Sequence, residues 1–110
     1  MPERTHILHL AEHSLWDVAR AHGAYRMSTR GRTLEQEGFI HCSTSAQLPS
    51  VAAFSYGSYE GPDELVVLVV DPARLDVPVK YEAPEAGAEK FPHVYGPIPV
   101  DAVVEVTPWR

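Results

Sequence analysis

Two short stretches decide the fold: Gly38-Phe39-Ile40-His41-Cys42-Ser43 and Phe91-Pro92-His93-Val94-Tyr95-Gly96-Pro97-Ile98. Each places a histidine two residues before a hydroxyl side chain. Because residues i and i+2 of an extended strand point to the same face, we expect His41 and Ser43 to share one face. His93 and Tyr95 are expected to share a face of the other strand. Two such strands predict the wall of a polar small-molecule site.

Apolar runs around these stretches predict the remaining strands. Leu65–Val70 is apolar on both faces, which predicts a central strand that is covered on both sides. The other expected strands span residues 5–10, 38–43, 77–82, 93–98 and 102–107.

Two helices and one isolated helical turn are expected. Ser14 and Asp17 resemble a capping box for the first helix, which Gly23 is placed to end. Thr33 to Glu37 is expected to form one turn that stops at Gly38. The second helix is expected over residues 47–56, with residues 51–54 as its packing surface.

The length of 110 residues predicts a single domain over residues 1–110. The element pattern predicts an α+β fold with two short helices packed on a split, curved, mostly antiparallel sheet of about six strands. The absence of a G-x-G-x-x-G motif argues against a dinucleotide-binding doubly wound fold.

The formal net charge of −6 gives no overall attraction to nucleic acid or to an anionic membrane, so no stable binding to either is expected. The longest apolar run is too short to span a bilayer, and residues 1–6 contain no apolar signal segment. A cytoplasmic protein is therefore expected. The single cysteine, Cys42, excludes an internal disulfide and a cysteine-rich metal site.

His9, His41 and His93 each lie within an apolar strand, where an unpaired polar group would cost about 1–3 kcal/mol. Each must therefore have a built partner or face a pocket. Together they could form a three-histidine metal site, but no short ligand pair supports one, and no metal is expected. Cys42 is expected to point away from His41, and Ser43 lacks the G-x-S-x-G elbow of a nucleophile.

The two histidine motifs, together with Tyr81-Glu82 and an early helix that carries Trp16, closely resemble the bacterial domain-of-unknown-function family 952. The resemblance covers nearly the whole chain. It implies a small fold of the ADP-ribosyltransferase type, related to the tRNA 2′-phosphotransferase branch, in which NAD lies in a cleft between two half-sheets. It also implies that the ligand is NAD, as a substrate, or an ADP-ribose-type nucleotide.

The resemblance further implies roles for the residues at the matching positions. His41 and His93 would be catalytic, with His93 as the acid–base group at the reacting ribose. His9 and Ser43 would contact ribose and phosphate oxygens, and Tyr95 would stack on the nicotinamide or base.

One departure from the related enzymes leaves two functions open. Their late strand often carries a glutamate that stabilises the positive charge of the transition state, whereas this chain offers His93 and Tyr95 there. Glu82 is the candidate substitute among the ligand-binding residues. The chain is thus expected to be an NAD-dependent ADP-ribosyl or phosphoryl transferase, or alternatively a non-catalytic module that binds a nucleotide or another small molecule.

Overall fold

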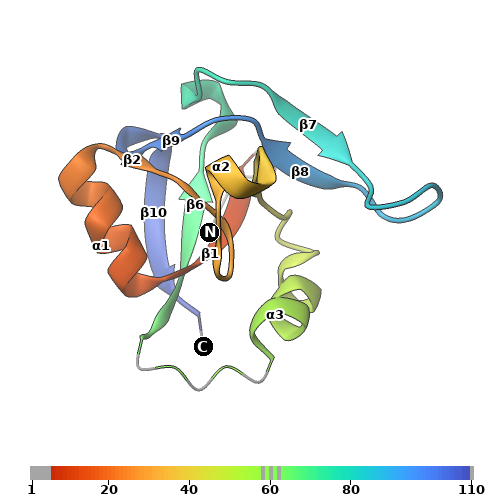
Figure 1. The fold of residues 1–110 in the computed structure, drawn as a ribbon, viewed down its shortest axis with the longest axis horizontal. Helices are drawn as coiled ribbons and strands as arrows, with labels where there is room; N and C mark the ends of the chain where they lie inside the picture. Colours follow the sequence, from red (N-terminus) through yellow and green to blue (C-terminus); the bar gives the residue numbers. More distant parts are fainter. Residues whose placement is uncertain (1–5, 58, 60, 62, 110) are drawn as a thin grey trace.

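The strand β6 (Leu65–Val70) is the centre of one of the two three-stranded sheets in the described part of the chain. It pairs antiparallel with β1 (Ile7–Glu12) on one side and with β10 (Val103–Pro108) on the other (Figure 1). The structure is a computed structural model and describes residues 6–57, 59, 61 and 63–109. The central position predicted for the 65–70 run is confirmed.

Helices cover both faces of this sheet because its strands are apolar on both. On one face, Trp16 and Ala19 of α1 (His13–His22) pack in a core that includes Ile7. On the other face, α3 (Leu48–Tyr56) packs Leu48, Ala52 and Tyr56 against other residues of β1 and β6. Figure 1 shows the two helices on opposite sides of the sheet.

A second antiparallel sheet, in the order β5-β8-β7, carries both histidine motifs. Its strands are β5 (Ile40–His41), β8 (Phe91–Val94) and β7 (Val79–Glu82). The smaller elements are β2 (Ala24–Tyr25) paired with β9 (Ile98–Pro99), β3 (Met27–Thr29) paired with β4 (Arg32–Thr33), the helix α2 (Leu34–Glu37), and 3-10 turns at Pro72–Arg74 and Val100–Ala102.

The α+β class and the antiparallel pairing are confirmed, but the element counts are not. The described part of the chain forms three α-helices and ten strands, against two helices and about six strands in the prediction. The expected strand at 93–98 is divided between β8 and β9, and the expected turn before Gly38 is a short helix. The first strand runs from Ile7 to Glu12, and Thr5 of the expected strand lies outside the described residues.

The helix boundaries show which local signals acted. Gly23 and Gly38 end α1 and α2 with φ near +90°, a conformation that glycine adopts without a steric penalty. The capping box predicted at Ser14 is wrong, because α1 begins one residue earlier. The Ser14 N–H and hydroxyl instead both donate to the carboxylate of Asp63, in the loop before β6.

The packing face predicted for α3, residues 51–54, is confirmed at Ala52 and wrong at Ala53 and Phe54. Phe54 is 93% exposed and Ala53 is exposed, whereas the buried residues recur every four positions. None of the described helices is both long enough and apolar enough to pass through a membrane.

Candidate functional site

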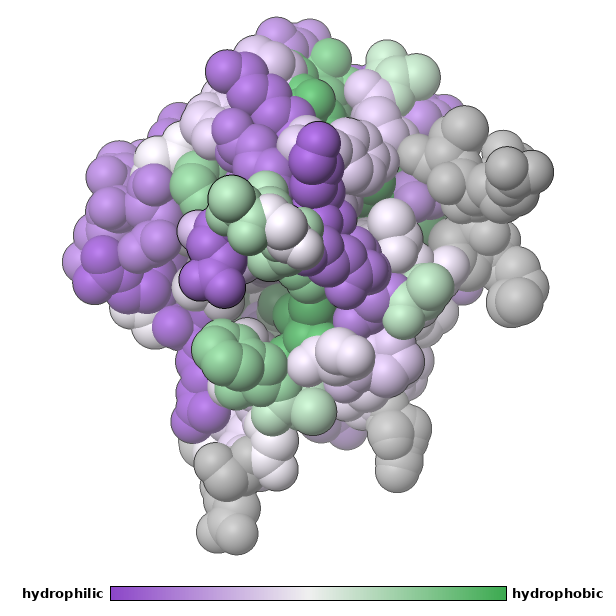
Figure 2. Space-filling model, turned by 90° about the vertical axis from the view of Figure 1, so that its right-hand side faces the viewer, coloured by the Kyte–Doolittle hydropathy of each residue, from purple (hydrophilic) through white to green (hydrophobic). Residues whose placement is uncertain are grey.

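A cavity of about 820 Å³ lies between α3, the β5–β8 pair and the loop that follows β7. Its volume is in the range of small-molecule sites. Its lining residues are Thr29, Phe39, His41, Cys42, Ser50, Val51, Phe54, Ser55, Glu82, Ala83, Pro84, Phe91 and His93. Figure 2 looks onto the side of the molecule that carries α3 and the β7–β8 hairpin, and shows hydrophobic side chains around a hollow among hydrophilic ones.

His41 and His93 meet at the wall of this cavity. They are opposite each other in the antiparallel β5–β8 ladder, and their ring centroids are 5.2 Å apart. The ring of Phe39 stacks on His93, with 4.1 Å between centroids and 16° between the planes. The fully buried Ser28 holds Phe39 in place by donating a hydrogen bond to its carbonyl.

Glu82, at the end of β7, links two of the predicted site residues. Its Oε1 accepts a 2.5 Å hydrogen bond from the Tyr95 hydroxyl and lies 2.9 Å from His93 Nδ1. The hydrogen bonds from Tyr95 and His93 hold the pKa of Glu82 below its usual value. Because an ionised carboxylate only accepts hydrogen bonds, His93 Nδ1 must carry the proton, and in the neutral ring Nε2 is then a free base.

Tyr95 supports the site from behind and is not among the cavity-lining residues. Its bond to Glu82 raises the pKa of the Tyr95 hydroxyl, and Lys80 Nζ lies 4.8 Å from the centroid of its ring. The resemblance implied that Tyr95 stacks on the ligand. Its position outside the cavity lining does not match that role.

His41 is half-buried, with 40% of its side chain exposed. Burial, and then the neighbouring His93, lower the pKa of His41. Its Nε2 lies 3.7 Å from Glu37 Oε1, and Glu37 is bound at 2.8 Å by Arg32. His41 is therefore held at the cavity wall with its ring mainly neutral at pH 7.

His9 lies beneath the cavity wall and does not line it. It is 3% exposed, and burial lowers its pKa to about 4. In this neutral ring, Nδ1 donates to the carbonyl of His41 at 2.6 Å, and Nε2 accepts from the Tyr25 hydroxyl at 2.9 Å. His9 thus fixes the backbone of His41, and the ligand contact implied for it does not match its position.

Ser43 also lies away from the cavity lining, and it is 2% exposed. Its backbone N–H and carbonyl both pair with Leu8 of β1, at 2.8 and 2.7 Å. Ser43 therefore joins the two sheets. Because it does not line the cavity, its position does not match the ligand contact that the resemblance implies.

A three-histidine metal site does not form. Both ring nitrogens of His9 are engaged by protein groups, so His9 offers no lone pair to a metal shared with His41 and His93. Within the described ranges, no group of three or more His, Cys, Asp or Glu side chains is arranged to hold a metal ion.

Phe54 and Phe91 also line the cavity, and neither was among the predicted site residues. The signal for Phe54 was the spacing of Leu48, Ala52 and Tyr56, which marks the buried face of α3 and leaves Phe54 on another face. Phe91 lies two residues before His93, so strand alternation places both on the same face.

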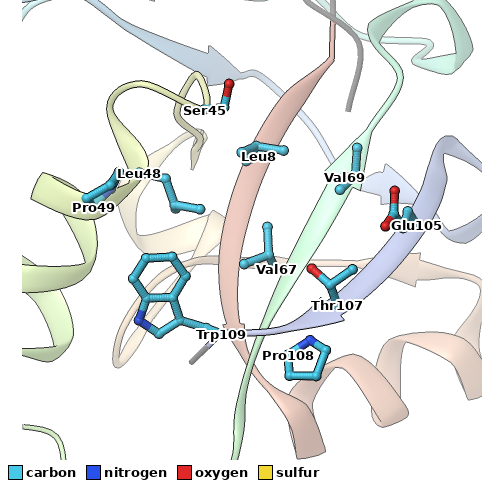
Figure 3. Close-up of a pocket in the computed structure, with 10 residues that line it drawn as sticks. All are labelled: Leu8, Ser45, Leu48, Pro49, Val67, Val69, Glu105, Thr107, Pro108 and Trp109. Carbon is cyan, nitrogen blue, oxygen red and sulfur yellow. The ribbon is translucent and has the colours of Figure 1, made fainter. Parts of the chain in front are cut away.

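A second cavity, of about 500 Å³, lies on the face of β1 and β6 that α3 covers, and it extends to β10. Figure 3 shows Leu48 and Trp109 beside its apolar floor of Leu8 and Val67. Among the described residues of its lining, Glu105 is the one ionisable side chain, so this cavity offers less chemistry than the histidine cavity.

Comparisons with known proteins show the family of this chain. The model of the family described as "Protein of unknown function (DUF952)" matches residues 10–106. The crystal structure of CC0527 from Caulobacter crescentus is 30% identical, with a TM-score of 0.74, over 94% of this chain and 85% of that chain. The solution NMR structure of CC0527 is 32% identical, with a TM-score of 0.70, over 94% and 83% of the two chains. No curated protein matches. With a family match over most of its length and a fold shared with CC0527, this chain belongs to the DUF952 family.

Proposed function

We propose that the protein binds NAD, or an ADP-ribose-type nucleotide, in the histidine-lined cavity and transfers the ADP-ribosyl group. The observation that supports this most is the Glu82–His93 pair at the cavity wall, with 2.9 Å between Oε1 and Nδ1. A carboxylate that orients an imidazole is a common arrangement for acid–base catalysis. We also propose that this fold is related to that of the ADP-ribosyltransferases. In this proposal Glu82 takes the role of the glutamate on their late strand.

The proposed reaction breaks the bond between the ribose C1′ and the nicotinamide nitrogen, and the bonding electron pair leaves with nicotinamide. An oxygen of water or of an acceptor hydroxyl forms the new bond to C1′. Its proton passes to His93 Nε2, and the Glu82 carboxylate stabilises the resulting imidazolium. Stacking on Phe39 holds the imidazole plane during this transfer.

The test is a calorimetric titration with NAD and then with ADP-ribose, followed by an assay for released nicotinamide. We expect saturable binding to the wild type and loss of binding in the double variant His41→Ala, His93→Ala. The matched control is His13→Ala, His22→Ala, which changes two histidines of α1 that do not line the cavity. Absence of binding to either nucleotide would remove NAD from the function. Normal turnover by a folded His93→Ala variant would remove His93 from the chemistry.

A second candidate function is binding without catalysis. The mainly apolar lining, with Val51, Phe54, Pro84 and Phe91, favours it because such surface holds a ligand without acting on it. Saturable affinity for a nucleotide with no product after prolonged incubation would distinguish this function from the transferase.

A further inference from the structure

We propose that the cavity selects a planar ring that carries a positive charge, of the N-alkylated pyridinium class, and that Phe54 covers this ring. The inference rests on the proposed function for the location of the site. It adds which part of a ligand enters the cavity, and it names a binding residue on α3.

The first argument is the charge of the lining residues. Glu82 is ionised, because the hydrogen bonds from Tyr95 and His93 lower its pKa. Burial lowers the pKa of His41 and raises that of Cys42 to about 12, which keeps both groups mainly neutral at pH 7. Among the residues that the structure describes, no lysine or arginine lines the cavity, so the Glu82 carboxylate favours a negative potential there.

The neighbouring cations are held outside the lining by partners of their own. Arg32 is bound to Glu37 at 2.8 Å, and Lys80 lies over the ring of Tyr95. Arg30 donates to the carbonyl of Ser55 at 2.9 Å, and its guanidinium lies 5.2 Å from the centroids of two tyrosine rings. A phosphate group would therefore be repelled from the cavity by Glu82, whereas a cation would be attracted.

The second argument is the aromatic surface. Phe54 and Phe91 both line the cavity, and Phe54 is 93% exposed although it is a large apolar side chain. The faces of aromatic rings carry negative partial charge and attract cations, so a cationic ring gains from these phenylalanines as well as from Glu82. An exposed phenylalanine on a helix that is otherwise packed through Leu48, Ala52 and Tyr56 is positioned to close on such a ring.

The geometry also divides a whole nucleotide between two places. The cationic ring would enter beside Glu82. The phosphates would remain at the outer edge of the cavity, near Arg30. The Arg30 guanidinium donates to the backbone carbonyl of Ser55, which is a lining residue. The remaining guanidinium N–H groups of Arg30 are suited to phosphate oxygens.

The experiment titrates the protein with three forms of one ring: N-methylated nicotinamide, which is a cation, nicotinamide, which is neutral, and nicotinate, which is an anion at pH 7. Affinities are read from NMR chemical-shift changes. We expect the cation to bind about tenfold more tightly than nicotinamide, and nicotinate to bind most weakly. Phe54→Leu should lower the affinity for the cation by about fivefold. Glu82→Gln should remove most of the difference in affinity between the cation and nicotinamide. Tyr81→Leu, at another exposed aromatic residue that does not line the cavity, should change nothing.

Equal binding of the three rings, no binding of the cation, or an unchanged affinity in Phe54→Leu would each overturn the inference. Because Phe54 is exposed, its substitution is not expected to impair folding, and the NMR spectrum checks this directly. The same experiments distinguish this inference from the proposed transferase function. Tight binding of the cation without release of nicotinamide from NAD would exclude the transfer reaction but support the preference for a cationic ring.

Discussion

His41 and His93 are directly opposite each other in the β5–β8 ladder, with their ring centroids 5.2 Å apart at the wall of one cavity. The nearness of His93 contributes to the lowered pKa of His41, because two adjacent imidazolium charges repel each other. A positive charge on His93 therefore disfavours protonation of His41. This suits a site in which one imidazole accepts a proton and the other stays neutral.

The carboxylate of Glu82 fixes the proton on His93, so Glu82→Gln is expected to change the tautomer of His93. The wild type should show His93 with its proton on Nδ1 in nitrogen-15 NMR at neutral pH. In the variant, an amide that can also donate removes this preference, and nicotinamide release should fall by about 100-fold. Glu85→Gln, in the loop after β7, is the control and should leave both readouts unchanged. A wild-type His93 protonated on Nε2 would contradict the assignment.

The buried His9 is expected to make stability depend on pH. Its pKa is about 4 in the folded protein and 6.5 in the unfolded chain, so the unfolded chain takes up a proton as the pH falls through 6.5 and the folded protein does not until about pH 4. The free energy of unfolding should therefore fall by about 3 kcal/mol between about pH 7 and pH 4 from this group alone.

Urea unfolding of the wild type and of His9→Gln across this pH range isolates the contribution of His9. Carboxylates titrate in both proteins and cancel in the difference. The variant should be less stable at neutral pH but should lose about 3 kcal/mol less on acidification. The His22→Gln control, at the end of α1, should follow the wild type. Parallel pH profiles for the wild type and His9→Gln would show that His9 does not carry this effect.

Tyr25→Phe tests the other side of the same hydrogen-bond chain. Tyr25 is 2% exposed, and its hydroxyl is the partner of His9 Nε2. Its removal leaves a buried acceptor unpaired, so the protein should lose about 1–3 kcal/mol of stability in urea unfolding. In the background of His9→Gln the same change should cost less, and equal costs in both backgrounds would disprove the coupling.

Local signals in the sequence predicted what local chemistry determines. The helical turn predicted from Thr33 to Glu37 is observed as the helix α2, and Gly38 ends it with a positive φ. The six-residue apolar run at β6 predicted a central strand. The repeated histidine motif predicted two strands at the wall of a polar site, and the observed pairing of those strands brings His41 and His93 together.

Tertiary contacts decided the rest. Strand alternation placed Ser43 beside His41, but β5 contains only Ile40 and His41, and the chain then pairs with Leu8 of β1. The burial of His9 depends on Tyr25, a residue that no motif connects to it. Consecutive apolar residues from 51 to 54 could not define which face of α3 is buried, and only the spacing of Leu48, Ala52 and Tyr56 does.

Gln47 ties the loop after β7 to the start of α3, and this loop contributes Ala83 and Pro84 to the cavity. The Gln47 side chain, 8% exposed, donates to Glu89 Oε2 at 2.9 Å and to the carbonyl of Lys90 at 2.8 Å. Its Oε1 accepts from the N–H of Thr44 at 3.0 Å. Gln47→Ala should therefore release the loop and increase amide hydrogen exchange over residues 83–90, with a loss of about 1–3 kcal/mol in stability.

Gln36→Ala is the matched control for this prediction. Gln36 makes the same reciprocal bonds with Thr33, at 2.8 and 3.2 Å, but this partner is the N-cap residue of α2 and Gln36 does not line the cavity. Its substitution should cost about 0.5–2 kcal/mol and leave exchange over residues 83–90 unchanged. If both variants increase exchange in the loop equally, general destabilisation explains the effect. If only Gln47→Ala does so and ligand affinity falls with it, the wall of the cavity is held in place by this one side chain.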